Sequence, residues 1–176
     1  KYSYDEITRL AEESASFRSF IDTDHPDFQL PGDMPSKIKA FARKTNQPIP
    51  KTDGEIFRTV YESLALKYRY VFEEIMECTN KQFNQGHIVG GGSQAEILCQ
   101  MVANASNIEV LAGPVEATVI GNSAVQLISQ KVFKNVSEAR DVIKKSFDVK
   151  SYQPDQHEKW NLHYDDFKNI LLSGGR

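Results

Sequence analysis

Cysteine and histidine are scarce in this sequence of 176 residues. The two cysteines, Cys78 and Cys99, each lie within helix-like sequence, which excludes a disulfide framework and predicts two unlinked, reduced thiols. The histidines are scattered, and no two of them have the helical or strand spacing of zinc ligands. We therefore expect no metal site, and we interpret all four as structural or exposed: His25, His87, His157 and His163.

Long apolar runs and an excess of charge of one sign are also lacking. The longest apolar runs are too short to span a bilayer, and the segment that begins at Lys1 is polar rather than signal-like. A net charge of -3 creates no field that would gather nucleic acid or anionic lipid over a distance. We therefore expect a cytoplasmic protein without a nucleic-acid or membrane partner.

The whole chain is 40% hydrophobic, which suffices for the core of one domain. Helical patterns dominate its first half. A capping box at Ser3–Glu6 predicts the start of a short helix that ends near Ser14. A second capping box, Thr52–Glu55, predicts the start of a long helix that includes Ile75. A further short helix is expected to end near Asn46, before two prolines force an extended segment.

A long ordered loop is predicted between residues 17 and 35, where Asp, Pro and Gly are frequent. Its acidic residues lack the regular ligand spacing and the closing Glu of a calcium loop. We interpret them as turn residues: Asp22, Asp24, Asp27 and Asp33.

The hydrophobic period changes after Gly86. A short β-favouring run, His87–Val89, is followed by three glycines, by a helix predicted from Ser93 to about Ala105, and by a second strand, Val110–Ala112. This order predicts a parallel α/β unit with a right-handed crossover.

The remaining sequence predicts two more helices and a tail. The first helix begins near Glu116 and is expected to bury its apolar residues: Val119, Ile120, Ala124, Leu127 and Ile128. Its first-turn carboxylate, Glu116, is interpreted as a favourable charge at a helix start rather than as a general base. The second helix is expected from Ser137 to about Phe147, and residues 155–176 are expected to form a polar tail in which Asp165–Asp166 is solvated.

Gly90, Gly91 and Gly92 form the one segment for which both the predicted fold and the residue chemistry indicate a ligand site. Glycine lets a ligand approach the backbone closely, and the helix that follows offers unpaired amide donors with a partial positive charge. The pattern matches neither the dinucleotide fingerprint nor the phosphate loop that ends in Gly-Lys-Ser/Thr. The spacing of the glycines alone does not decide between a nucleotide site and a turn that serves only helix packing.

Several segments resemble the C-terminal domain of the FGGY carbohydrate kinases: His87–Gln94, Leu98–Gln100, Ala103–Ala105, Ala112–Thr118 and Gly121–Asn122. The similarity extends from about Phe17 to Pro154 and includes Phe17–Ile21, Pro31–Pro35 and Tyr61–Tyr68. The run Ala112–Ala117 is the more specific feature and resembles the branch of the family that acts on L-rhamnulose.

The resemblance implies an α/β fold, the C-terminal part of an actin-like ATPase (ribonuclease H-like) domain, helix-rich with a small parallel sheet. Residues 1–154 would form the C-terminal kinase domain, truncated at its N-terminal side, and residues 155–176 a tail. ATP would contact Gly91, with Gly90 and Gly92 beside it. The implied reaction moves the γ-phosphoryl group of ATP, bound with Mg²⁺, to a sugar hydroxyl.

The resemblance also implies what lies elsewhere. The catalytic aspartate, a phosphate-binding glycine motif and the sugar contacts are expected upstream of Lys1, in an N-terminal domain of the same chain, so this chain alone is expected to be inactive. Position 95 carries Ala where the family usually has Asn, which removes a possible polar contact to the nucleotide. A kinase of L-fuculose or of another ketose or polyol, and a non-catalytic nucleotide-binding module, stay open as alternatives.

Overall fold

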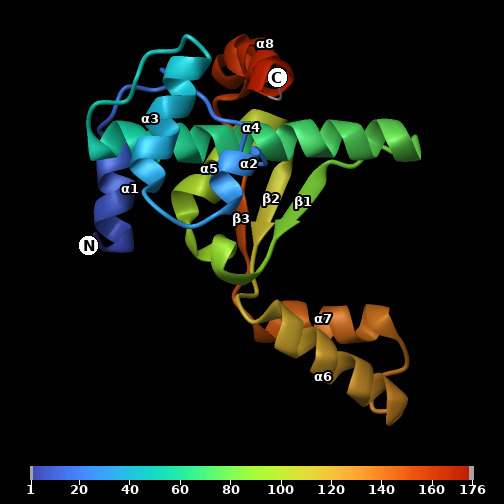
Figure 1. Cartoon of the computed structure of the whole chain (residues 1–176). Helices are drawn as coiled ribbons and strands as arrows, with labels where there is room; N and C mark the ends of the chain where they lie inside the picture. The colour runs from blue at the N-terminus through green and yellow to red at the C-terminus, as the bar shows by residue number, and fades with distance from the viewer. Residues whose placement is uncertain (1, 175–176) are drawn as a thin grey trace.

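The first half of the molecule is helical. The structure, a computed structural model, describes residues 2–174. Four helices precede the sheet: α1 (Tyr4–Glu12), α2 (Pro26–Gln29), α3 (Met34–Lys44) and α4 (Asp53–Thr79) (Figure 1). Both predicted capping boxes are present. The side chains of Ser3 and Thr52 accept hydrogen bonds from the backbone amides of Glu6 and Glu55, respectively, and each Glu carboxylate accepts one from the backbone amide of its N-cap residue. The loop predicted from 17 to 35 contains the short α2 as an addition.

The predicted strand, helix and strand form one parallel unit. Strands β1 (Gln85–Ile88) and β2 (Glu109–Ala112) pair in parallel, with Gln85 opposite Glu109, and α5 (Glu96–Ser106) crosses between them. A third strand, β3 (Lys150–Tyr152), pairs antiparallel with β2, so the sheet is mixed rather than wholly parallel. This strand has three residues and no buried face, and therefore carries no alternating hydrophobic signal.

The helix after the glycines begins later than predicted. Gly90–Gln94 forms a short 3-10 helix, η1, and α5 begins at Glu96. The side chain of Ser93, expected at the start of this helix, instead donates to the carbonyl oxygen of Gly90 at 2.7 Å. The glycine segment is therefore a structured turn that Ser93 closes.

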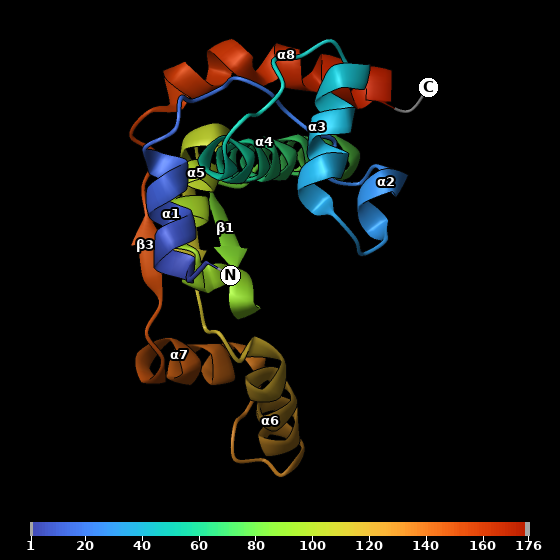
Figure 2. The same ribbon diagram turned by 60° about the vertical axis from the view of Figure 1, so that its left-hand side comes forward.

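The core lies where α4, α5, the sheet and the last helix, α8 (His157–Gly174), meet, with α4 lying across α5 (Figure 2). Its fully buried side chains come from distant parts of the sequence: Leu66 of α4, Cys99 and Val102 of α5, Val110 of β2 and Phe167 of α8. A smaller cluster under α3 contains Ile38 and Phe41.

The segment expected to be a polar tail forms helix α8 (His157–Gly174) in its described part, which corrects that expectation. Trp160, Tyr164 and Phe167 are buried against the core. Tyr164 donates to a carboxylate oxygen of Glu73 at 2.5 Å, and the guanidinium of Arg69 lies 3.7 Å from the Tyr164 ring centre. Burial and the bond to Glu73 raise the pKa of Tyr164, so this residue ties α8 to α4 as a neutral donor.

Helices α6 (Ala117–Ser129) and α7 (Val136–Ser146) form a hairpin that stands off from the rest of the molecule (Figure 1). The expectation that α6 is buried is wrong, because α6 has no buried residue and Val119 is 61% exposed. The other four expected residues are only half-buried. Since α6 packs chiefly on α7, no second layer covers its apolar stripe.

Among residues 2–174, no helix is both long and apolar enough to cross a membrane.

Candidate functional site

The turns that follow β1 and β2 meet at the carboxyl edge of the parallel strands. The Gly113 amide donates to the Ile88 carbonyl oxygen at 2.8 Å, and the Gly90 amide donates to the Pro114 carbonyl oxygen at 3.2 Å. Ligands of open α/β sheets bind outside the carboxyl ends of parallel strands. We call Gly90–Gln94 together with Gly113–Ala117 the carboxyl-edge site.

The three predicted glycines differ in what they do there. Gly90 has a φ of +73°, a left-handed conformation that favours glycine. A Cβ on Gly92 would meet Ile88 at an ordinary 3.5 Å, whereas a Cβ on Gly91 would meet nothing within 4 Å. The backbone at Gly91 thus faces open space, which is the room that a ligand in contact with it requires. Binding of ATP by Gly90, Gly91 and Gly92 stays a prediction.

The helices that begin at this edge lack side-chain caps. Helices α1, α3, α4 and α7 each begin with a side chain that accepts from a first-turn amide. By contrast, the N-cap residues of η1, α5 and α6 make no such bond; they are Val89, Ala95 and Glu116. First-turn amides that no side chain satisfies are available to an anion, which the helix dipole also favours.

Two side chains behind the glycine turn fix its shape, and sequence reasoning assigned neither this role. Ser93 is buried and bonds back to Gly90. The fully buried Sγ of Cys99 lies 3.8 Å from the Gly92 carbonyl oxygen and 3.9 Å from that of Ser93. Burial, and then the charge of Glu96, raise the pKa of the Cys99 thiol, so it remains a protonated donor. Cys78 and Cys99 are both free, which confirms the prediction of unlinked thiols.

Three of the four acidic residues interpreted as turn residues in the 17–35 loop have structural contacts: Asp22, Asp24 and Asp33. Asp33 caps α3 through the Ser36 amide, while Asp22 and Asp24 pair with Lys67 at 3.5 and 2.9 Å. Glu116 is exposed at the start of α6. Within the part of the chain that the structure describes, no three His, Cys, Asp or Glu side chains are grouped to hold a metal ion.

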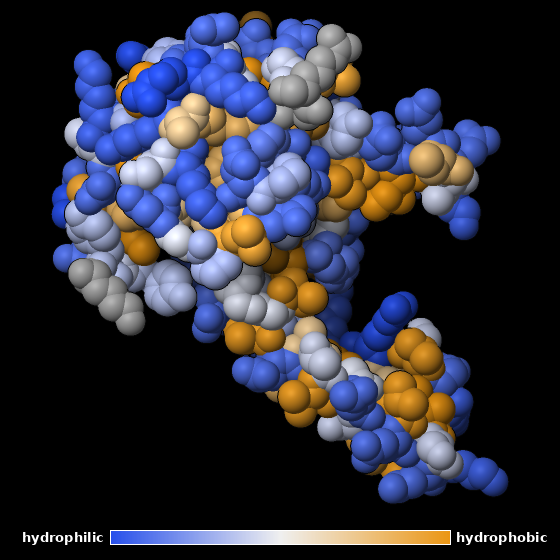
Figure 3. Space-filling view, in the orientation of Figure 1, coloured by the Kyte–Doolittle hydropathy of each residue, from blue (hydrophilic) through white to orange (hydrophobic). Residues whose placement is uncertain are grey.

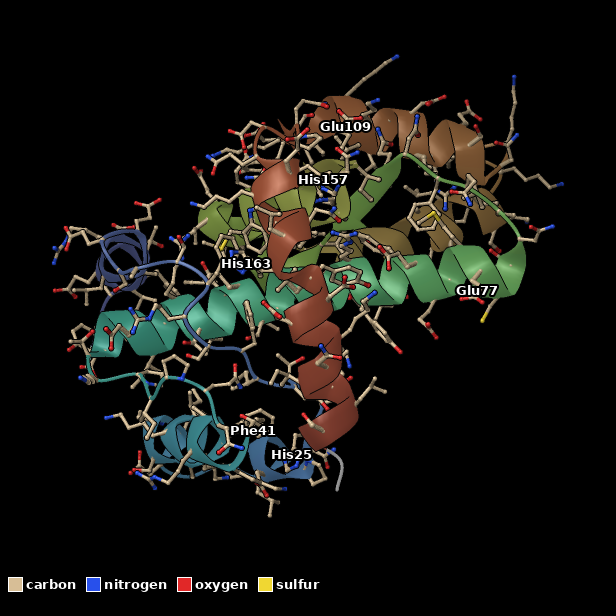
Figure 4. The ribbon with its side chains drawn as sticks, turned by 90° about the horizontal axis from the view of Figure 1, so that it is seen from above. His25, Phe41, Glu77, Glu109, His157 and His163 are labelled. Carbon is tan, nitrogen blue, oxygen red and sulfur yellow. The ribbon has the colours of Figure 1, made fainter. Side chains whose placement is uncertain are left out.

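The histidines lie apart. Figure 4 shows His25 beside Phe41, with ring centres 5.2 Å apart, and His157 and His163 on α8. His157 contacts the carbonyl oxygen of Asn104 at 3.0 Å, and His163 stacks on Phe17 at 4.4 Å. These contacts support the structural interpretation of these three side chains.

Comparison with known proteins identifies related sequences over most of the chain. The FGGY family of carbohydrate kinases, C-terminal domain, matches residues 2–129. A rhamnulokinase of Bacteroides thetaiotaomicron is 39% identical over 169 residues, covering 96% of this chain and 35% of that protein. A rhamnulokinase of Bacillus subtilis is 37% identical, covering 87% of this chain and 32% of that protein. The chain thus spans about a third of the length of these curated relatives.

The fold has a counterpart among solved structures. The crystal structure of xylulose kinase from Rhodospirillum rubrum superposes with a TM-score of 0.55 at 18% identity, covering 72% of this chain and 26% of that chain. At this identity the likeness concerns the fold alone.

Proposed function

Because this chain belongs to the FGGY family of carbohydrate kinases, we propose that it supplies the nucleotide-binding part of an ATP-dependent kinase of L-rhamnulose. The product would be L-rhamnulose 1-phosphate, formed in the breakdown of L-rhamnose. The choice of sugar is supported by the relatives named rhamnulokinase, at 39% and 37% identity over most of the chain.

The observation that carries the nucleotide assignment is the meeting of two turns at the carboxyl edge. The bond from Gly90 to Pro114 holds them together, and Gly91 is left with open space above its backbone. The adenosine side of ATP would lie against Gly91, where the absence of a Cβ permits close approach. The uncapped first-turn amides of α5 and α6 would face its negative charge.

The chain's own residues bind and orient rather than perform the chemistry. Glu96 forms an ion pair with Lys150, and Glu116 lies at a helix start. Phosphoryl transfer also needs a group that accepts the hydroxyl proton and a metal that neutralises the phosphates. We place both, with the sugar contacts, in the remaining two thirds of a longer kinase.

A chimeric enzyme tests this proposal. The segment of the Bacteroides thetaiotaomicron rhamnulokinase that aligns with this chain is replaced by this chain, and ADP release is measured with and without L-rhamnulose. We expect sugar-dependent ADP release from the chimera and none from this chain alone. A folded chimera that binds ATP without turnover favours the non-catalytic nucleotide-binding module. Turnover by the isolated chain contradicts the proposal that the catalytic groups lie in the rest of a longer kinase. The identity of the sugar substrate is tested by measuring ADP release with L-rhamnulose and with L-fuculose. The protein used for this comparison is the chain joined to its own upstream region.

A further inference from the structure

A cleft of ≈ 590 Å³ separates the sheet from α7. Figure 3 shows the molecule hollowed above the α6–α7 hairpin. Val89, Leu111 and Pro114 line the cleft on the strand side, and Ile143 lines it from α7. Val89 directly precedes Gly90, and Pro114 accepts the Gly90 bond, so the cleft is continuous with the carboxyl-edge site.

The charged residues of the cleft are both cations. Arg140 and Lys144 lie four residues apart on α7, which places them on the same face of the helix. Among the described residues 2–174, no acidic residue lines the cleft. Neither Arg140 nor Lys144 has an ion-pair partner within 4 Å among residues 2–174.

The carboxylate of Glu109, which is influenced by the charge of Lys144, is already engaged elsewhere. The Glu109 carboxylate accepts from Ser151 Oγ at 2.6 Å and from Gln85 Nε2 at 2.5 Å. These bonds chiefly lower the pKa of Glu109, and Lys144 adds a smaller effect in the same direction. Glu109 therefore stays ionised and does not neutralise Lys144 by direct contact.

We propose that Arg140 and Lys144 bind the phosphate chain of the nucleotide across this cleft. The inference rests on the proposed function and adds a second wall to the nucleotide site, opposite the glycine turn. Guanidinium and ammonium groups form charge-assisted hydrogen bonds with phosphate oxygens. The α6–α7 hairpin, which contributes little to the core, would then serve to present the two cations.

Calorimetric titration of the purified chain with ATP, adenosine and inorganic triphosphate tests the proposal. Arg140→Ala and Lys144→Ala should each weaken ATP binding roughly tenfold and leave adenosine binding unchanged. Inorganic triphosphate should compete with ATP for the wild-type chain. Lys144→Arg should keep most of the affinity, and Lys134→Ala, which removes the same charge outside the cleft, should have no effect.

The outcomes separate this inference from the proposed function. Wild-type affinity for ATP in Arg140→Ala and Lys144→Ala overturns the role of the cleft but leaves nucleotide binding at the glycine turn intact. An equal loss in Lys134→Ala also overturns it, because the effect would then reflect net charge alone. Absence of ATP binding by the wild-type chain overturns both.

Discussion

The amide of Gly90 donates a 3.2 Å hydrogen bond to the carbonyl oxygen of Pro114 and so joins the turn after β1 to the turn after β2. Both turns contain a glycine with a positive φ, Gly90 at +73° and Gly113 at +117°. The candidate nucleotide site therefore depends on two separate segments keeping these conformations together. This relationship leads to predictions about each turn.

Gly113 should tolerate no side chain. A Cβ there would lie 2.9 Å from the carbonyl oxygen of Asp148, in addition to the strain of the left-handed φ. We expect Gly113→Ala to lower the free energy of unfolding by about 1–3 kcal/mol, measured by urea denaturation. Gly121→Ala is the matched control, because Gly121 lies within α6 and its Cβ would meet nothing within 4 Å. Alanine should stabilise that helix by up to about 1 kcal/mol, and equal losses in both variants would contradict the account.

Position 95 should accept the family's asparagine with a gain in stability. Ala95 occupies the N-cap of α5, where Asn can accept a bond from a first-turn amide. Ala95→Asn is expected to raise the free energy of unfolding by roughly 1 kcal/mol and to hold or improve ATP affinity. Ala95→Asp supplies the same cap but adds a negative charge, so it should stabilise the chain and weaken ATP binding. A loss of ATP affinity in Ala95→Asn would show that the pocket is built around alanine.

Helix α8 should be essential to the core. Phe167 is fully buried between α8 and the body, so Phe167→Ala should cost about 3–5 kcal/mol in the free energy of unfolding. Leu172 lies on the same helix and is 77% exposed, so Leu172→Ala should change stability by less than about 0.5 kcal/mol. Chemical denaturation of both variants decides this, and similar small effects would mean that α8 does not dock as described.

Much of the strand and helix order was readable from the sequence because it rests on local patterns. The change from helical to β periodicity at His87 and the glycine run located β1, the glycine turn and β2. The start of α5 differs because the helix was predicted from Ser93, whereas the side chain of Ser93 bonds back to Gly90 and α5 begins at Glu96. The apolar spacing of Trp160, Tyr164 and Phe167 was a helical signal that the polar residues between them obscured.

Other features follow only from three-dimensional packing. The burial of α6 was overestimated because an apolar stripe does not reveal whether a second layer covers it. The three glycines look alike in sequence, and only the structure shows that Gly90 sets the turn while Gly91 faces open space. Arg140 and Lys144 gave no signal at all, since their proximity to the glycine turn arises from the hairpin's position.

Glu62 should make stability depend on pH. This side chain of α4 is 1% exposed and accepts bonds from the Arg58 side chain at 2.6 Å and from the Phe17 amide at 2.7 Å. Burial raises its pKa despite these partners, so the folded chain holds the proton more tightly than the unfolded chain. Stability from this group is therefore present at pH values below the ordinary pKa of 4.5 and is lost as the pH rises through the folded-state pKa.

The Glu62→Gln variant isolates this effect. Urea denaturation from pH 4 to pH 7 should show the wild-type chain losing stability relative to Glu62→Gln as the pH rises, since the amide does not titrate. A gain of wild-type stability relative to the variant over this range would contradict the sign given for Glu62.

The affinity of Gly91→Val for ATP, measured by calorimetry beside its free energy of unfolding, tests the nucleotide site most directly. Because a Cβ at this position meets nothing within 4 Å, the variant should fold with a stability within about 1 kcal/mol of the wild type. Its valine side chain would occupy the space proposed for the nucleotide, so ATP affinity should fall at least roughly tenfold, the equivalent of about 1.4 kcal/mol. A variant that folds normally and keeps the wild-type affinity for ATP would remove Gly91 from the site and contradict the account.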